Sequence, residues 1–307
     1  MSILVSGASG FVGGALVRRL AGEGKEVHLV LRSGSSRQRL EGLSGICVHE
    51  ADLRDADRVR AVVSEVRPRT IYHCAVYGGF ASQSDTSAIF ETNLTGTINL
   101  LQACERVGFE LFVNAGSSSE YGIKNHPMRE ADPAHPIGDY GVAKCAATMF
   151  CRSEALLKGL PVVTLRLFSP YGPWDDQRRF IPYLIRCLTA GDSPCISTPD
   201  SVRDYIFIDD VLDLYRAVSE ASVTPGEVYN AGSGRQHTIG EVAEIIRRIT
   251  GGPELVWGGA RPSRPEPKIW EADISKTSAD FGWRPSIGFE EGIRRTFEWF
   301  HGTHSFP

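Results

Sequence analysis

The first half of the chain alternates short apolar runs with longer stretches in which apolar residues recur at helical spacing. The apolar runs are rich in Val, Ile and Leu and do not alternate cleanly with polar residues, at 2–6, 26–31, 45–50, 70–75, 110–115 and 161–168. Such runs are typical of parallel strands that are buried on both faces. Between them we predict helices at 11–22, 55–66, 86–107 and 138–158. The alternation predicts an α/β fold with a Rossmann-like, doubly wound parallel sheet.

The pattern changes after residue 168, where Pro and Gly become frequent and the apolar runs become short and isolated. A strand–helix pattern returns over 204–218, and helices are predicted at 238–250 and 288–300. No run of Ser, Gly or Pro is long enough to form a free linker. We therefore predict a Rossmann-like domain over 1–168, to which 203–230 returns, and a smaller mixed α/β lobe over 169–307.

Composition and charge narrow the class of protein. Of the 307 residues 42% are hydrophobic and 23% are charged, and the formal net charge is −4 with no Lys/Arg block. This argues against a non-specific nucleic-acid or membrane-surface role. The apolar runs are shorter than the ~20 residues of a transmembrane helix, and "MSILVSGASG" lacks a secretory leader's basic start. The seven scattered Cys form no C-x-x-C, so we expect reduced thiols, no disulfide framework, no metal site and a cytoplasmic protein.

A glycine loop follows the first predicted strand and opens the first predicted helix. Gly7, Gly10 and Gly13 stand in the spacing G-x-x-G-x-x-G. Small residues let the chain turn tightly, let a pyrophosphate approach the backbone and let the helix pack on the sheet. The helix N-terminus then offers its N–H groups and positive dipole end to the phosphates. A glycine-rich turn without a ligand is the alternative interpretation.

The end of the second strand indicates which dinucleotide would bind. An NAD site usually has a carboxylate here for the ribose 2′-hydroxyl, but "VHLVLRSGSSRQR" has no acid before Glu41. It offers Arg32, Ser33 and Arg37 instead, and a guanidinium can hold a 2′-phosphate through two hydrogen bonds. NADP(H) is favoured, NAD(H) stays possible, and a solvated basic loop is the alternative.

Tyr140 and Lys144 are four residues apart on a predicted helix and therefore share one face. A free Tyr has a pKa near ~10, and an adjacent ammonium typically lowers such a value by about 1–3 units. The pair could thus carry a proton at neutral pH. A Tyr-x-x-x-Lys pair alone is a weak signal, because many exposed helix faces contain one.

Taken with the glycine loop, several segments resemble the extended short-chain dehydrogenase/reductases, an NAD(P)-dependent epimerase/dehydratase family acting on nucleotide sugars. The resemblance covers nearly the whole chain and includes "EADLRD", "HCA", "ETNLTGTINLLQA", "YGVAK", "RLFSPYGP", "RDYIFIDDV" and "VYNAGSG". It implies that Ser117 of "SSSEYG" binds the reacting oxygen of the sugar and that Tyr140 and Lys144 complete the catalytic set. It also implies a homodimer through the helices at 86–107 and 138–158. His73, at the end of a predicted strand, is expected to pack there and not to catalyse.

The resemblance further implies binding residues. Cofactor contacts are expected from Gly7, Ser9, Gly10, Phe11, Val12, Gly13, Arg32, Ser33, Arg37, Asp52, Leu53, Cys74, Ala75, Tyr140, Lys144 and Phe168. Contacts with the nucleotide-sugar substrate are expected from Ser118, Ser169, Arg179, Arg203 and Arg264, with Arg178 as an alternative to Arg179. Ser169 stands where the family usually has Asn, which puts that contact in doubt.

The position of Glu120 bears on the reaction. Dehydratases of the family place two acids directly after the residue matching Ser117, but Ser118 and Ser119 occupy those positions. Glu120 comes one residue later, and one step along a strand turns a side chain to the opposite face. Glu120 is thus either a capping or pairing carboxylate or a catalytic one.

We favour an NADP(H)-dependent 4-ketoreductase of an NDP-4-keto-6-deoxy sugar in deoxysugar biosynthesis. The alternatives are an NDP-sugar 4-epimerase with tightly bound NAD(P), a dehydratase or decarboxylase, and a non-catalytic NADP(H) sensor.

Overall fold

The computed structural model describes residues 2–80, 82–196, 198–258 and 267–302, in two structural units. The first unit comprises Met1–Gly122, Glu130–Leu167 and Leu214–Asn230. The second comprises Ile123–Arg129, Phe168–Asp213 and Ala231–Pro307. Each unit is built around its own sheet.

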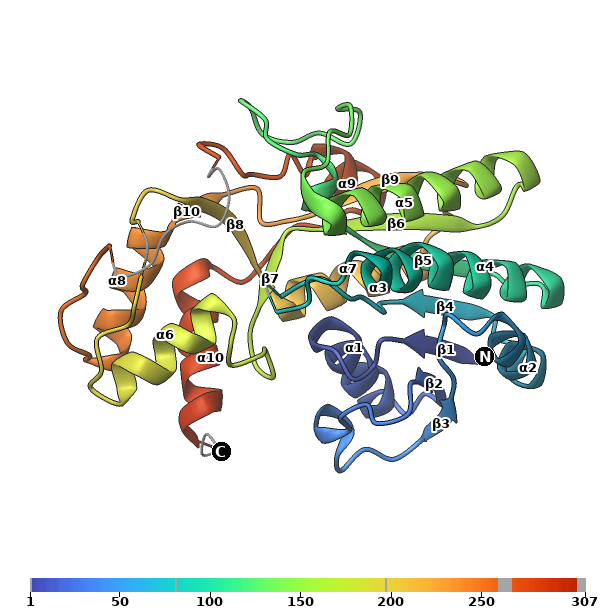
Figure 1. Ribbon diagram of the computed structural model, residues 1–307, viewed down its shortest axis with the longest axis horizontal. Helices are drawn as coiled ribbons and strands as arrows, with labels where there is room; N and C mark the ends of the chain where they lie inside the picture. The colour runs from blue at the N-terminus through green and yellow to red at the C-terminus, as the bar shows by residue number, and fades with distance from the viewer. Residues whose placement is uncertain (1, 81, 197, 259–266, 303–307) are drawn as a thin grey trace. The chain divides into compact units, whose positions relative to one another are not determined.

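The first unit contains a seven-stranded sheet in the order β3-β2-β1-β4-β5-β6-β9 (Figure 1). The strands are β1 (Ile3–Ser6), β2 (Val27–Leu31), β3 (Ile46–Glu50), β4 (Thr70–His73), β5 (Leu111–Ser117), β6 (Val162–Leu167) and β9 (Val228–Ala231). All pairs from β3 to β6 are parallel. The order reverses between β1 and β4, and this reversal opens a crevice at the carboxyl ends of the strands. The predicted Rossmann-like fold class is confirmed, as are the six strands predicted in the first half.

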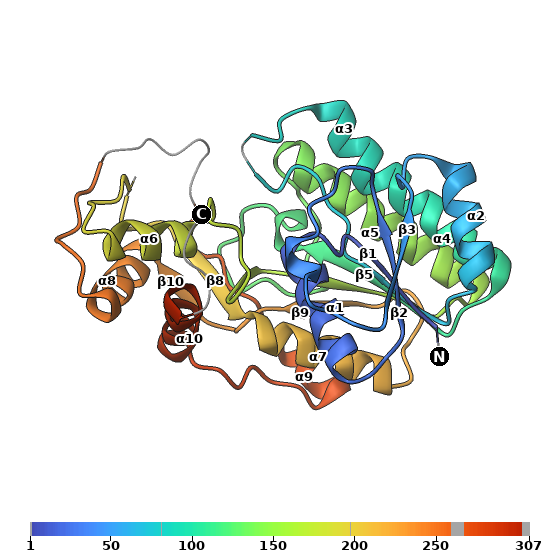
Figure 2. The ribbon, with the colours of Figure 1, turned by 90° about the horizontal axis from the view of Figure 1, so that it is seen from below.

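Helices cover both faces of this sheet (Figures 1 and 2). On one face lie α2 (Ala56–Val66), α4 (Gly96–Val107) and α5 (Gly138–Lys158), and on the other lie α1 (Phe11–Gly22) and α7 (Ile208–Glu220). Leu4, Ile71 and Phe112 of the strands pack in one buried cluster with apolar side chains of α2, α4 and α5. On the opposite face Tyr72 meets Tyr215 of α7 edge to face at 5.7 Å. None of the helices within the described ranges has the length and apolar character needed to cross a membrane.

The helix predicted over 86–107 is interrupted in the structure. It consists of α3 (Thr86–Phe90), a π-helical turn η2 (Glu91–Thr95) and α4. Asn93 in this turn is fully buried and bonds both backbone groups of Tyr77, donating to the carbonyl at 2.6 Å and accepting from the N–H at 3.2 Å. The extra residue in the turn directs this amide at the loop after β4, which hydrophobic spacing alone does not reveal.

The second unit has a three-stranded sheet in the order β10-β8-β7. Its elements are β7 (Ser169–Tyr171), β8 (Val202–Phe207), β10 (Gln236–Thr238), α6 (Phe180–Thr189), α8 (Ile239–Thr250), α9 (Ser275–Phe281) and α10 (Phe289–Gly302). The sequence predicted that 203–230 returns to the Rossmann domain. In the structure β8 pairs with β7 and β10, and the first unit resumes at Leu214. Helices α6 and α9 were not predicted.

Asp204 of β8 links three segments of the second unit. Its side chain is fully buried and accepts hydrogen bonds from the backbone N–H groups of Ser233, Gly234 and Ala272 and from the Ser233 hydroxyl. Burial raises the pKa of Asp204 to about 6, although these donors act in the opposite direction. The carboxylate thereby fixes two connecting loops to the central strand of the small sheet.

Candidate active site

A cleft of about 110 Å³ lies in the first unit, where the sheet order reverses. It is lined by Gly7, Ser9, Gly10, Val30, Leu31, Arg32, Ser35, Ala51, Asp52, Leu53, Cys74, Ala75, Val76 and Thr92. These residues follow or end the strands β1 to β4, except Thr92, which comes from the π-helical turn. The cleft therefore occupies the position where open α/β sheets bind their ligands.

The glycine loop has the backbone geometry that its sequence predicts. Gly7 adopts φ +73°, and a Cβ there would lie 2.4 Å from the backbone nitrogen of Ala75. A Cβ on Gly13 would lie 2.4 Å from the carbonyl oxygen of Gly7. Gly10 is the N-cap of α1, and no side chain caps the first turn of that helix. The uncapped N–H groups at the edge of the cleft suit the phosphates of a dinucleotide, so the residues present fit such a cofactor.

The far end of the cleft carries one cation and one acid. Arg32 is exposed at the end of β2. Asp52 is held by Arg54, which donates to both of its carboxylate oxygens, and this hydrogen bonding lowers the pKa of Asp52. Arg39 does not line the cleft but donates to the carbonyl of Ser9 at 3.0 Å, which ties the loop after β2 to the glycine loop.

The structure brings about half of the expected cofactor residues into this cleft. Those that line it are Gly7, Ser9, Gly10, Arg32, Asp52, Leu53, Cys74 and Ala75. Those that do not are Phe11, Val12, Gly13, Ser33, Arg37, Tyr140, Lys144 and Phe168. Phe168 belongs to the second unit, where its N–H bonds to the carbonyl of Ala231. The sequence analysis missed the apolar lining residues of β2 and Val76, because apolar side chains at strand ends carry no chemical signature.

Ser117 ends β5 and caps the short 3₁₀ turn η3 (Ser118–Glu120). Its hydroxyl oxygen accepts the N–H of Ser119 at 3.2 Å, while its own N–H donates to Oε1 of Glu120 at 2.8 Å. This reciprocal capping box holds the side chain in one orientation. The Ser119 N–H occupies one of the two lone pairs of the Ser117 oxygen, and the hydroxyl keeps its own proton for donation.

Glu120 forms an ion pair inside the first unit. Its side chain is fully buried, and Oε2 accepts the Nε–H of Arg166 at 2.8 Å. Oε1 also accepts the hydroxyl of Thr148 on α5 at 3.0 Å. A Cβ on Gly116 would lie 2.7 Å from Oε1, so only glycine leaves room for the carboxylate there. Glu120 is thus a capping and pairing carboxylate, one of the two roles that the sequence left open.

Tyr140 and Lys144 lie on α5, as predicted, one turn apart. Tyr140 is half-buried and Lys144 is 2% exposed. Burial lowers the pKa of Lys144, and the charge of Glu120 acts in the opposite direction. Gly141 brings this helix onto η3, because a Cβ there would lie 2.9 Å from the carbonyl oxygen of Ser119. The Tyr–Lys helix and the serine turn are therefore in direct contact.

His73 is a buried packing residue. Its Nε2 lies 2.8 Å from the Thr97 hydroxyl, which itself donates to the carbonyl of Asn93, so Nε2 must carry the proton. Its Nδ1 then accepts from the hydroxyl of Ser6 at 2.7 Å. Burial lowers the pKa of His73 to about 3, which keeps the ring neutral. Both ring nitrogens are engaged within the core, which agrees with the predicted packing role.

Of the residues expected to contact the substrate, Ser169, Arg178, Arg179 and Arg203 belong to the second unit. The guanidinium of Arg203 lies 5.7 Å from the ring centroid of Trp270, and Arg203 donates to the carbonyl of Val202. Arg179 precedes α6 and pairs with Asp175 at 3.5 Å. Arg178 forms a separate pair with Asp176 at 2.8 Å. Ser169 begins β7, Ser118 lies in η3 of the first unit, and Arg264 lies outside the described residues.

Comparison with known proteins gives the family of the chain. The family model described as NAD dependent epimerase/dehydratase family matches residues 3–232. Among curated proteins, the dTDP-glucose 4,6-dehydratase of Salmonella typhimurium is 25% identical over 98% of this chain and 92% of its own length. The UDP-glucose 4-epimerase of Streptomyces lividans is 28% identical over 98% of this chain and 96% of its own.

Solved structures agree with this assignment. A UDP-glucose 4-epimerase of Thermus thermophilus in complex with NAD has a TM-score of 0.88 at 30% identity, covering 99% of this chain and 100% of that one. A UDP-glucose 4-epimerase of Thermotoga maritima with UDP-glucose has a TM-score of 0.89 at 27% identity, with 98% of each chain covered. The family resemblance seen in the sequence is confirmed: the chain belongs to the NAD-dependent epimerase/dehydratase family, the extended short-chain dehydrogenases that act on nucleotide sugars.

Proposed function

We propose that this enzyme transfers hydride at C4 of a nucleotide-activated hexose and that it is an NADP(H)-dependent 4-ketoreductase of an NDP-4-keto-6-deoxy sugar. The observation that carries the proposal is the set of Ser117, Tyr140 and Lys144, held together by the contact between η3 and α5. All three residues are of the kind that handles a proton at an oxygen atom. None of them is suited to removing a proton from carbon.

The proposed roles follow from the geometry of these side chains. Bound NADPH supplies the hydride for the C4 carbonyl carbon. Ser117 donates its hydroxyl proton in a hydrogen bond to the carbonyl oxygen, a role supported by the capping box that fixes the orientation of its side chain. Tyr140 gives its phenolic proton to the same oxygen, so the carbonyl becomes a hydroxyl. Lys144, buried one turn along the helix, stabilises the phenolate that remains.

Dehydration is disfavoured because of Glu120. A 4,6-dehydratase needs acid–base groups at C5 and C6, and Glu120 is the carboxylate in "SSSEYG". Its two oxygens accept hydrogen bonds from Ser117, Thr148 and Arg166 in a fully buried position. A carboxylate whose two oxygens are both engaged inside the core does not reach a substrate, which does not suit an acid that must protonate a sugar. Similarity to dTDP-glucose 4,6-dehydratases therefore does not carry their reaction to this chain.

The preference for NADP(H) rests on Arg32. It lies at the end of β2 and lines the cleft, where an NAD-binding protein usually has an acid. Asp52 also lines the cleft, but it is paired with Arg54. Because a guanidinium can bind a 2′-phosphate through two hydrogen bonds, we propose that Arg32 selects NADP(H). An exchangeable NADPH in turn favours a reductase over an enzyme that returns its hydride to the same sugar.

A 4-epimerase is the second candidate, and the comparisons favour it. Two of the solved structures similar to this chain are UDP-glucose 4-epimerases, one of them in complex with NAD. In an epimerase, Tyr140, assisted by Ser117 and Lys144, would accept the proton of the C4 hydroxyl and later return it, and a bound dinucleotide would take up and return the C4 hydride. In either case we propose that Arg179 and Arg203 bind the substrate diphosphate, together with Arg264.

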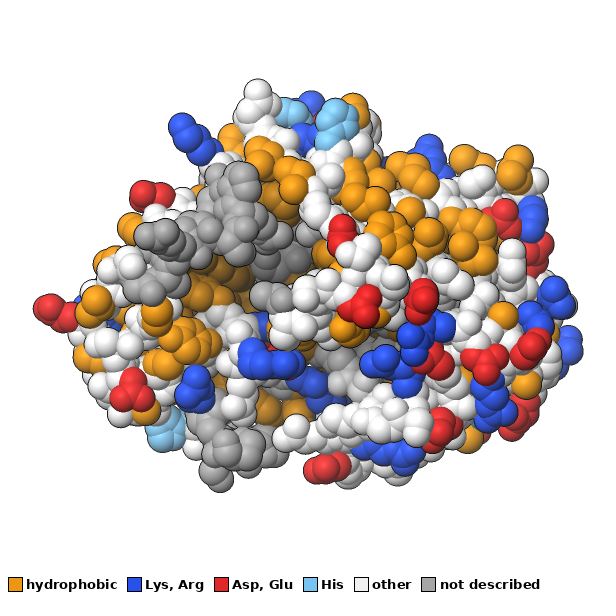
Figure 3. Space-filling view, in the orientation of Figure 1, with side chains coloured by type: hydrophobic (Ala, Val, Ile, Leu, Met, Phe, Trp, Pro, Cys, Tyr) orange, Lys and Arg blue, Asp and Glu red, His pale blue; other side chains and the backbone are white. Residues whose placement is uncertain are grey.

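We also propose a homodimer formed through α5. Val142, Met149 and Leu156 are spaced seven residues apart along this helix and are 39%, 47% and 62% exposed. Figure 3 shows hydrophobic side chains gathered over the position of α5. An exposed apolar stripe of this length along one helix is typical of a helix–helix interface.

Substitution of Tyr140 by Phe should lower turnover by about 10²–10⁴-fold, because it removes the proton donor and leaves the ring. Loss of NADPH absorbance with a panel of NDP-4-keto-6-deoxyhexoses would measure the rate. Ser117→Ala should cost less, since a water molecule could replace one hydroxyl. Full turnover in Tyr140→Phe would refute the assignment of the site.

Interconversion of NDP-hexose C4 epimers by the wild-type protein, without consumption of NADPH, would show that the enzyme is an epimerase and not a reductase.

Glu120→Gln should lower the free energy of unfolding by about 3–5 kcal/mol, because it leaves the charge of Arg166 buried without its partner. Urea denaturation would measure the loss. Glu110→Gln is the matched control, since the Glu110–Arg69 pair is exposed and should be worth at most about 1 kcal/mol. In the folded variant, reductase activity should persist. Complete loss of turnover with unchanged stability would instead indicate a catalytic Glu120.

Arg32→Asp should reverse the cofactor preference from NADP(H) to NAD(H), because a carboxylate repels the 2′-phosphate and accepts from the 2′-hydroxyl. Calorimetric titration of both dinucleotides would show the reversal. Arg37→Asp carries the same charge change outside the cleft lining and should alter the preference much less. Tighter binding of NAD(H) than NADP(H) by the wild-type protein would contradict the prediction.

The double substitution Met149→Glu, Leu156→Glu should convert a dimer into a monomer, since it places two charges on the apolar stripe of each copy. Light scattering at micromolar concentration would give the mass. Val256→Glu changes an exposed apolar residue that is not on α5 and should leave the dimer intact. A wild-type protein that is monomeric under these conditions would rule out the interface.

A further inference from the structure

Three metal-ligating side chains meet on two neighbouring strands of the first unit, away from the cleft. His28 lies on β2, and Cys47 and His49 lie on the edge strand β3. His28 is paired in register with Cys47, and His49 comes two residues later on the same strand. Side chains paired across parallel strands, and those two residues apart, project from the same face of a sheet. The strand pairing therefore places all three on one face.

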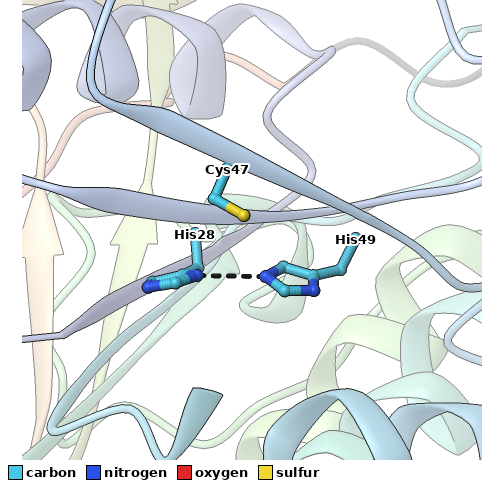
Figure 4. A group of neighbouring side chains, drawn as sticks. All are labelled: His28, Cys47 and His49. Atoms are coloured by element: carbon cyan, nitrogen blue, oxygen red, sulfur yellow. Dashed lines mark hydrogen bonds between the residues drawn. The ribbon is translucent and has the colours of Figure 1, made fainter. Parts of the chain in front are cut away.

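The three side chains point toward a common point (Figure 4). Nδ1 of His28 lies 3.0 Å from Nε2 of His49, and one ligand atom from each of the three residues lies within 4.8 Å of the others. His28 and His49 are half-buried, and Cys47 is exposed, so solvent ions can reach the group. Among the residues that the structure describes, these three form the one group of at least three His, Cys, Asp or Glu side chains that lie close enough together to hold a metal ion.

The donor set indicates the class of ion. Imidazole nitrogen and thiolate sulfur are ligands of Zn²⁺ and related borderline or soft ions, whereas Mg²⁺ and Ca²⁺ prefer oxygen. Zinc–ligand bonds of about 2.0–2.3 Å in a tetrahedron place neighbouring donors roughly 3.3–3.6 Å apart. The two nitrogens, 3.0 Å apart, are a few tenths of an ångström closer than this. The three ligand atoms lie within 4.8 Å of one another, so the sulfur would have to move inward by up to about 1 Å. Cys47 is exposed, so its side chain has room to rotate toward the two imidazoles.

We propose that His28, Cys47 and His49 form a binding site for a Zn²⁺-class divalent cation, which clamps the edge strand β3 to β2. Three protein ligands leave a fourth position for water. None of the three residues lines the cleft, so the ion would stabilise the sheet edge and take no part in the proposed reaction. No metal site was expected from the sequence, because it contains no cysteines at metal-binding spacing. These ligands are separated by up to 21 residues and meet only across the strands.

The alternative is a hydrogen-bonded histidine pair with an unrelated thiol beside it. In that arrangement one imidazole donates to the other, and Cys47 contributes nothing to the binding of an ion. The two interpretations differ in the role of the sulfur. A bound ion would hold Cys47 as a thiolate, because metal coordination removes the thiol proton. A test must therefore detect a metal–sulfur bond as well as metal affinity.

The experiment uses the full chain without a polyhistidine tag, kept reduced. Titration with Zn²⁺ against a chromophoric chelator should give one bound equivalent, and Co²⁺ should give thiolate-to-cobalt charge-transfer absorption. Cys47→Ser should abolish that absorption. His49→Asn should weaken Zn²⁺ binding by at least about 100-fold, since losing a ligand should cost more than losing an outer-shell partner. Zn²⁺ should also raise the midpoint temperature of wild-type unfolding, because it binds only the folded strand pair.

Cys195→Ser is the matched control, because Cys195 is also exposed but lies in the second unit. It should leave both the Co²⁺ spectrum and the Zn²⁺ affinity unchanged. Absence of the charge-transfer band in the wild-type protein would overturn the proposal, whatever the variants do. Equal Zn²⁺ affinity in wild type, Cys47→Ser and His49→Asn would overturn it as well.

Discussion

The buried ion pair between Glu120 and Arg166 joins the elements that carry the proposed chemistry. Removing two charges from water costs several kcal/mol for each, and the cost is offset only where other groups also satisfy them. Glu120 receives that support from the N–H of Ser117 and the hydroxyl of Thr148. The pair therefore connects the end of β5, the strand β6 and the helix α5, and the orientation of Ser117 depends on it.

Two glycines in these segments make the arrangement possible. Gly116 leaves space for the carboxylate of Glu120, and Gly141 lets α5 contact the carbonyl of Ser119. The same contact places the helix of Tyr140 and Lys144 against the turn that Ser117 caps. The charge of Glu120 also opposes the effect of burial on the pKa of Lys144. A single carboxylate thus orients one member of the proposed catalytic set and favours the charged form of another.

Most of the first unit could be predicted from its sequence, for a physical reason. Parallel strands buried on both faces are continuous apolar runs, and the glycine loop must be small where Gly7 approaches Ala75 and Gly13 approaches Gly7. The role of Glu120 could not be decided, because its partner Arg166 is 46 residues away and meets it only through the pairing of β5 with β6. The π-helical turn at Asn93 was missed because it preserves apolar spacing on both sides.

Strand β2 connects the dinucleotide cleft to the proposed metal site. Its carboxyl end presents Arg32 to the cleft, and His28 near its amino end belongs to the proposed metal site. The neighbouring β3 is an edge strand, and an edge strand pairs on one side only and has few contacts to fix its position. A cation bound by His28, Cys47 and His49 would fix the register of β3 on β2. Because β3 leads directly to Ala51 and Asp52 of the cleft, the clamp would hold one wall of the dinucleotide site without touching the dinucleotide.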